Sequence, residues 1–216
     1  MKNNTIDATL LNARVALENA QQDSNVAAAL TAFGYGPEKI TEGVALLDTA
    51  EELHQQQKKE YGEQYAATDA LDLALNTANK NYMRYVKLSR VVLKDDRGAW
   101  EALQLSGRRL KTYSGWIKQA KIFYTNAMAN AASLNKLEDI NIGVPQLQAG
   151  LQEVTQVEQL LSTQLREMGE AQSATLNRDK AMETLMDYMS DFTSIARIAL
   201  ENDPQYLEAL GIVEPS

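Results

Sequence analysis

Apolar positions recur at alternating intervals of four and three residues near the start of the chain. This first seam comprises Ile6, Leu10, Ala13, Leu17, Ala20, Ser24 and Ala27. Because such spacing lines up side chains on one face of a helix that packs on another, it predicts a first helix over residues 5–32. A second seam with the same spacing comprises Tyr113, Ile117, Ala120, Tyr124, Ala127, Ala131 and Leu134. Both seams indicate packing faces rather than ligand sites.

Two long segments with few helix breakers follow the seams, residues 38–93 and 145–200. Each would rise about 84 Å as a single helix, at 1.5 Å per residue. Their ends are apolar and their middles are polar, with Gly62 and Gly169 in the polar parts. A glycine inside a helix costs about 1 kcal/mol, too little to break the helix alone. We therefore expect continuous or merely kinked helices, and a turn at each glycine is the alternative.

Helix start and stop signals frame these segments. Pro37, which follows a glycine-rich break, is expected as a first helical residue. A short helix should follow each long one, the first through Trp100 and Leu103. In the second, Asp203 is expected as N-cap before Pro204.

These elements occur twice because the chain contains an internal duplication. Residues 43–103 align with residues 150–210 at an offset of 107 without a gap, and 18 of the 61 positions are identical. Repetition at a fixed offset is the signature of a duplicated structural unit. The sequence therefore predicts an all-α fold, an elongated antiparallel helical bundle with two long helices plus shorter helices. The repeats span residues 1–107 and 108–216, and we expect them to share one core and form one structural domain.

Two charged positions are retained between the repeats. Arg90 and Glu101 correspond to Arg197 and Glu208. We interpret each pair as an ion pair that ties the short helix to the long one.

Composition narrows the class of protein. The 216 residues include no cysteine and carry a net charge of −8. The missing thiols exclude disulfides and zinc–thiolate sites, and the acidic balance speaks against general nucleic-acid binding. No signal-peptide core and no run of about 18 apolar residues is present, so we expect no transmembrane segment and a cytoplasmic location.

Candidate chemistry is sparse. Glu51 and His54 have the Glu-x-x-His spacing of di-metal bundles, but the second repeat has Leu161 in place of the histidine, and His54 is the only histidine in the chain. The string GYGPEKIT lacks the spacing of a phosphate loop. Carboxylates retained in both repeats are typical of exposed helix faces. We therefore predict no metal, no cofactor and no catalytic residue, and an enzyme is the class that the sequence supports least.

One stretch departs from the acidic balance. Residues 80–121 contain eleven Lys and Arg but only three acidic residues. Basic residues beside aromatic ones can bind phosphates and stack bases. The candidate interaction surface comprises Lys80, Arg84, Lys87, Arg90, Lys94, Arg97, Trp100 and Trp116.

The second repeat carries the opposite charge at three equivalent positions. Asp187, Asp191 and Glu201 correspond to Lys80, Arg84 and Lys94. Sign reversal favours pairing between the two copies or between two subunits through complementary faces. A solvated face and a polyanion site are the alternatives.

The end of the chain, SDFTSIARIALENDPQYLEALGI (residues 190–212), resembles the C-terminal part of a group of uncharacterised bacterial helical proteins. Those proteins end in a similar Pro-Gln-x-Leu-Glu-x-Leu-Gly-Ile tail. No activity is attached to that group, so the resemblance implies only a helical fold. The most consistent role is a non-enzymatic helical scaffold or protein-interaction module, with a protein partner or self-association as a homo-oligomer. A polyanion or nucleic-acid binder using residues 80–121 and a membrane-active helical bundle are the alternatives.

Overall fold

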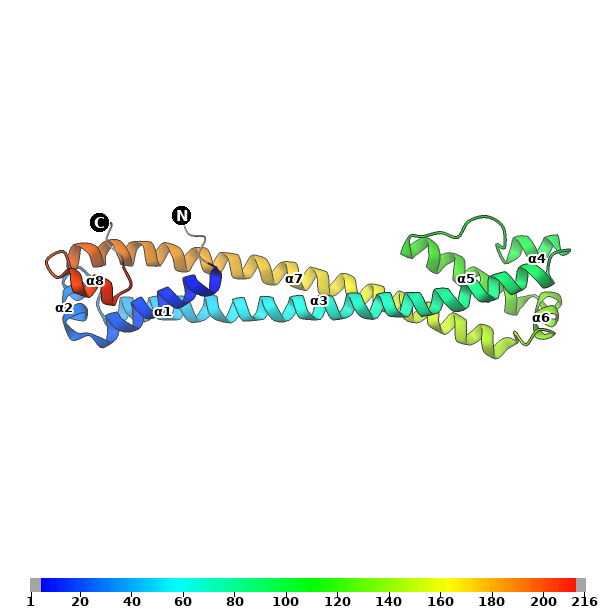
Figure 1. Cartoon of the computed structure of the whole chain (residues 1–216), viewed down its shortest axis with the longest axis horizontal. Coiled ribbons are helices and arrows are strands. Elements are labelled where there is room, and N and C mark those ends of the chain that lie inside the picture. Colours follow the sequence, from blue (N-terminus) through cyan, green and yellow to red (C-terminus); the bar gives the residue numbers. More distant parts are fainter. Residues whose placement is uncertain (1–4, 213–216) are drawn as a thin grey trace. The chain divides into compact units, whose positions relative to one another are not determined.

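The computed structural model describes residues 5–212, which form α-helices and no strand (Figure 1). The all-α prediction is therefore confirmed for this part of the chain. The helices, in chain order, are α1 (Ile6–Gln22), α2 (Ser24–Ala32), α3 (Pro37–Val92), α4 (Arg97–Ala102), α5 (Tyr113–Ala129), α6 (Ala131–Glu138), α7 (Val144–Ala199) and α8 (Pro204–Ala209).

The helix bounds follow the same offset of 107 residues as the sequence identities. Adding 107 to the bounds of α1, α3 and α4 gives the bounds of α5, α7 and α8. The caps correspond as well: the hydroxyl of Thr5 accepts from Ala8 N, and that of Thr112 accepts from Gly115 N. Each hydroxyl satisfies a backbone donor that the first helical turn leaves unpaired.

The expected single helix over residues 5–32 is wrong, because the chain breaks at Asp23. The Asp23 carboxylate accepts from the backbone N–H groups of Asn25 and Val26, and its backbone is extended. The residue thus ends α1 and caps α2. Asn130, its counterpart in the second repeat, caps α6 in the same way by accepting from Ser133 N. The apolar seam continues across such a break and does not reveal it, whereas the cap residues do.

The long helices run without a break through their glycines, which confirms the expected continuity. Gly62 lies inside α3 and Gly169 lies inside α7. A Cβ atom placed at either glycine would meet nothing within 4 Å. Neither glycine is therefore needed for a close approach of another element. Each lowers the stability of its helix only modestly, and the turns on either side keep the helix continuous.

The chain folds into two compact units, each made from parts of both repeats. Unit 1 contains residues up to Tyr61 and from Glu170 onward, whereas unit 2 is Gly62–Gly169. Unit 1 therefore combines α1, α2 and the start of α3 with the end of α7 and α8. Unit 2 combines the end of α3 and α4 with α5, α6 and the start of α7. The division between compact units thus differs from the predicted repeat boundary near residue 107.

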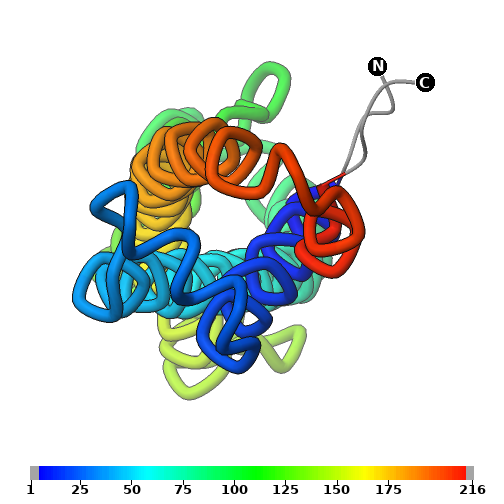
Figure 2. Tube along the Cα trace, turned by 90° about the vertical axis from the view of Figure 1, so that its left-hand side faces the viewer, coloured from blue at the N-terminus to red at the C-terminus, as the bar shows by residue number. Residues whose placement is uncertain are grey.

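In unit 1, the start of α3 packs antiparallel against the end of α7. The Tyr188 hydroxyl donates to the carbonyl of Lys39 at 2.7 Å, and the Tyr188 ring lies against Gly43. Figure 2, with unit 1 toward the viewer, shows α1, α3, α7 and α8 around a common centre. The buried core of this unit consists mainly of aliphatic side chains. It includes Leu17, Leu30, Leu47, Leu185, Phe192, Leu200 and Leu207.

The core of unit 2 is richer in aromatic rings. Tyr82 of α3 meets Phe123 of α5 edge to face, with ring centroids 5.6 Å apart. Phe123 in turn lies 5.2 Å from the Tyr124 ring. All three rings are completely buried. Edge-to-face contacts add directionality to hydrophobic burial, so this cluster fixes how α5 sits on α3.

Candidate functional site: the basic face of unit 2

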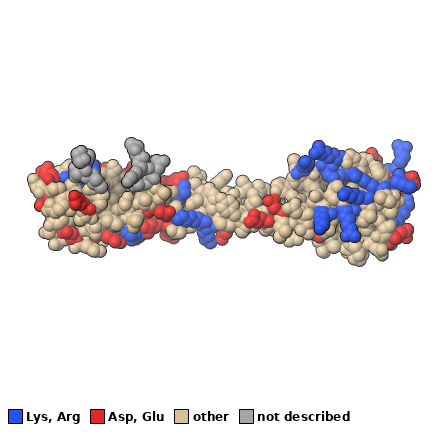
Figure 3. Space-filling model, viewed as in Figure 1, with Lys and Arg blue, Asp and Glu red and all other residues tan. Residues whose placement is uncertain are grey.

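The structure places all eight residues of the predicted interaction surface in unit 2. Lys80, Arg84 and Lys87 share one face of α3 by their spacing. Lys94 follows that helix, and Arg97 begins α4. Figure 3 shows Lys and Arg side chains gathered over unit 2 on the face in view.

We call the five exposed cations Lys80, Arg84, Lys87, Lys94 and Arg97 the basic face. The ion pairs recorded within unit 2 use other cations, among them Lys121 with Glu158 and Lys136 with Asp96. No described acidic side chain of unit 2 forms an ion pair with a member of the basic face. These charges are therefore solvated within the unit and available for an external anion.

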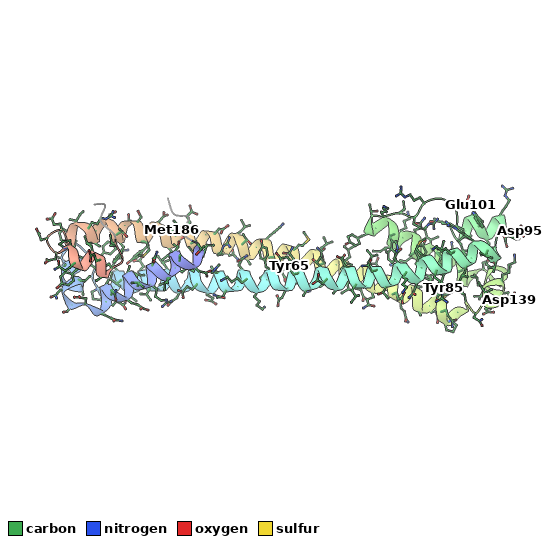
Figure 4. The ribbon with its side chains drawn as sticks, viewed as in Figure 1. Tyr65, Tyr85, Asp95, Glu101, Asp139 and Met186 are labelled. Atoms are coloured by element: carbon green, nitrogen blue, oxygen red, sulfur yellow. The ribbon has the colours of Figure 1, made fainter. Side chains whose placement is uncertain are left out.

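Arg90 has a structural role instead. Its Nε donates to the Leu105 carbonyl at 2.8 Å, and its Nη2 lies 3.4 Å from the Gly107 carbonyl. The predicted ion pair with Glu101 is wrong, because Glu101 is exposed on α4 (Figure 4) and the guanidinium is taken by carbonyl groups. Arg90 therefore fixes the segment between α4 and α5.

Arg109 anchors the same segment from the other side. Its guanidinium donates to the Tyr82 hydroxyl at 3.1 Å and to the Ser106 carbonyl at 2.5 Å. Burial raises the pKa of the Tyr82 hydroxyl above its usual range, with the Arg109 hydrogen bond acting in the opposite direction. The segment is thus held against the aromatic core rather than hanging free.

The two tryptophans are structural anchors rather than exposed stacking platforms. Trp100 is half-buried, and its indole N–H donates to the Ser106 hydroxyl at 2.7 Å. Trp116 is buried, and its indole N–H donates to Asn79 Oδ1 at 2.9 Å. Two other cations, Arg108 and Lys111, lie exposed near Trp116. Sequence reasoning counted these two within the basic stretch but did not single them out.

The predicted acidic counterpart belongs to unit 1. Asp187, Asp191 and Glu201 are all exposed there. The sequence of unit 1 carries eight Lys and Arg against eighteen Asp and Glu, a net charge of −10, whereas that of unit 2 carries thirteen against eleven, a net charge of +2. Charge is therefore strongly segregated between the units.

The single histidine links α1 to α3 in unit 1. His54 Nε2 lies 3.1 Å from Asp7 Oδ1, and the same carboxylate accepts from Lys58 Nζ at 3.2 Å. The hydrogen bond from Lys58 is the largest cause that lowers the pKa of Asp7, and the hydrogen bond with His54 is the next. Glu51 is also engaged, because it accepts two hydrogen bonds from the Arg14 guanidinium. These groups hold two helices together, which is the role that the local geometry supports.

No family model, curated protein or solved structure matches this chain. Within residues 5–212, no helix is both long enough and apolar enough to cross a membrane.

Proposed function

We propose that this chain is a non-enzymatic helical interaction module that associates with further copies of itself through the basic face of unit 2. The observation that carries the proposal is the row of five exposed cations that find no acidic partner within their own unit. Like charges held close together on a helix face are mutually unfavourable. An acidic surface that covers them relieves this repulsion.

The acidic surface that the chain itself offers is unit 1 of another copy. Asp187, Asp191 and Glu201 are exposed on that unit. Complementary patches of opposite sign accelerate encounter and fix the orientation of docking. Because the two patches differ, the contact closes as a twofold dimer if each copy supplies both patches to the other, and otherwise continues as a ring or an open chain.

The strength of such a contact follows from ordinary magnitudes. An exposed ion pair contributes about 0.2–1 kcal/mol, so pairs to the three acidic residues supply roughly 0.6–3 kcal/mol before apolar contacts are counted. Association on this scale is weak and is screened by salt.

A cytoplasmic location and kinship with the bacterial helical proteins remain parts of this proposal.

The test is light scattering across a gel-filtration peak at about 50 mM and about 500 mM salt. The mean mass should rise at low salt and fall toward that of one chain, 24.0 kDa, at high salt. The double variant Lys80→Glu/Lys87→Glu should remain at the mass of one chain under both conditions.

A matched control separates local pairing from net charge. Lys39→Glu/Lys180→Glu changes the net charge by the same amount but alters exposed lysines of unit 1. Self-association should persist in this variant or strengthen, because unit 1 becomes more acidic. Equal loss in both double variants would contradict the proposal. Tight, salt-sensitive binding of random single-stranded DNA by a chain that stays monomeric would instead favour the polyanion alternative.

A further inference from the structure

A cleft of about 580 Å³ opens in unit 2 beside the basic face. It lies between α3, the segment that joins α4 to α5, and the first turn of α5. Clefts of a few hundred cubic ångströms are the usual size for small-molecule sites. The residues that matter for recognition are Leu75, Met83, Arg108, Lys111, Tyr113 and Trp116.

The inner surface of the cleft is apolar and rigid. It includes Leu75, Met83 and Trp116. Trp116 is fixed by its hydrogen bond to Asn79 and by an edge-to-face contact with Tyr82, at a centroid distance of 6.1 Å. A wall whose side chains are already held in place binds a ligand without a further ordering cost.

The segment that joins α4 to α5 lines another side of the cleft, and it is also held in place by hydrogen bonds. Leu110 is 52% exposed, yet its backbone N–H donates to Gln119 Oε1 at 3.2 Å. Its neighbour Arg109 is tied to Tyr82 and to Ser106 by the bonds described above. The segment therefore keeps the cleft open with apolar side chains partly accessible.

The rim supplies positive charge and an aromatic face. Arg108 and Lys111 are exposed, and none of the ion pairs among the described residues involves either of them. Tyr113 is 39% exposed, and its hydroxyl lies 3.5 Å from Asp72 Oδ1, which holds the ring at the mouth. An Arg guanidinium presents donors in a fork that matches a phosphate or a carboxylate.

The equivalent position in unit 1 provides an internal comparison. A smaller cleft of about 310 Å³ is found there, with Thr9, Met186 and Ser190 at the positions of Trp116, Asn79 and Met83. Met186 is labelled in Figure 4. None of the described residues that line this cleft is charged or aromatic. Among the described residues, cations and aromatic rings therefore line the cleft of unit 2 but not the cleft of unit 1.

We infer that the cleft of unit 2 binds a small phosphate ester that carries a planar aromatic ring. The ring lies against Tyr113 and Met83, and the phosphate lies between Arg108 and Lys111. Arg108 donates in bidentate fashion, and Lys111 adds a second cation. This site is independent of the proposed self-association, because the members of the basic face do not line it.

The experiment uses adenosine 5′-monophosphate, adenosine and inorganic phosphate as probes. In a Trp100→Phe variant, Trp116 is the only tryptophan, so its fluorescence reports directly on the cleft. Titration calorimetry on the unmodified chain gives the affinity independently. The monophosphate should bind saturably with a dissociation constant on the order of 10–100 µM. Adenosine and phosphate should each bind at least about tenfold more weakly.

Two matched double variants decide the assignment. Arg108→Gln/Lys111→Gln should weaken the monophosphate at least about tenfold. Lys118→Gln/Lys180→Gln removes the same charge from exposed positions that do not line the cleft, and should leave the affinity unchanged. Circular dichroism checks that both variants remain helical. Equal weakening in both variants, or no saturable binding up to millimolar ligand, would overturn the inference. So would a random oligonucleotide that binds far more tightly than the mononucleotide.

Discussion

Gly43 offers the sharpest test of how the long helices pack in unit 1. A Cβ atom at this position would lie 2.4 Å from Tyr188 Cε1 and 2.6 Å from its Cζ. Carbon atoms in contact prefer about 3.5–4.0 Å, so the ring has to move. Tyr188 is only 9% exposed and donates to the Lys39 carbonyl, so movement breaks both packing and a hydrogen bond.

The magnitude follows from three contributions. Overpacking a core costs about 1–3 kcal/mol, and losing a typical hydrogen bond costs about 1 kcal/mol. Replacing glycine by alanine inside a helix returns about 0.5–1 kcal/mol. Gly43→Ala should therefore lower the free energy of unfolding by roughly 1–3 kcal/mol. Gly62→Ala on the same helix has open space around its Cβ and should raise it by about 0.5–1 kcal/mol.

Urea denaturation followed by circular dichroism measures both effects. A double-mutant cycle identifies the cause, because in a Tyr188→Ala background the change Gly43→Ala meets no ring and should become neutral or stabilising. If Gly43→Ala and Gly62→Ala shift stability by the same amount, the close approach between α3 and α7 is not as described.

Three further predictions rest on burial and on the division into units. Burial raises the pKa of Tyr188 well above its usual range. The unfolded tyrosine loses its proton near pH 10 while the folded one keeps it. The contribution of Tyr188 to the free energy of unfolding should therefore be fully present below that pH and be lost as the pH rises above it. Tyr188→Phe should make the urea midpoint fall less over this pH range. Phe123→Ala, at a fully buried ring, should cost about 3–5 kcal/mol in the same assay, whereas Phe33→Ala, at a ring 49% exposed, should cost far less. Cleavage at a protease site inserted after Gly107 should leave the two fragments associated on gel filtration, because each unit contains parts of both; separation into two folded halves would contradict this division.

Sequence patterns predicted the helices because local rules determine them. The seam positions Leu10, Leu17 and Ala20 are buried as expected. Pro37 begins α3 and Pro204 begins α8, since proline suits a first helical residue. The break at Asp23 was also present in the sequence as a cap residue, but the uninterrupted apolar spacing concealed it.

The spacing of apolar residues could not predict which helices pack together in each unit. An apolar seam shows which face of a helix is buried but not which helix covers it. Gly43 and Gly150 illustrate the point, because both are retained glycines that leave room for a tyrosine ring. Tyr188 of α7 fills the space at Gly43, whereas Tyr124 of α5 fills the space at Gly150. The same local signal is thus satisfied by different helices.

Sequence patterns have the same limit at the candidate site. Charge and helical spacing grouped Lys80, Arg84 and Lys87 on one face, and all three are exposed. They did not show that Arg90 turns to carbonyl groups, since backbone acceptors leave no trace in a charge pattern. The cleft depends on where the segment joining α4 to α5 folds back, and that is set by the long-range bond between Arg109 and Tyr82.

The most direct test of self-association through the basic face is zero-length carbodiimide cross-linking of mixed isotopically labelled and unlabelled chains. This reagent joins an amine to a carboxylate only when the two are in contact. Self-association through the basic face predicts mixed-isotope cross-links at low salt that join Lys80, Lys87 or Lys94 of one copy to Asp187, Asp191 or Glu201 of another. They should disappear at high salt. Cross-links that are confined to single chains, or that avoid these lysines altogether, would contradict the account.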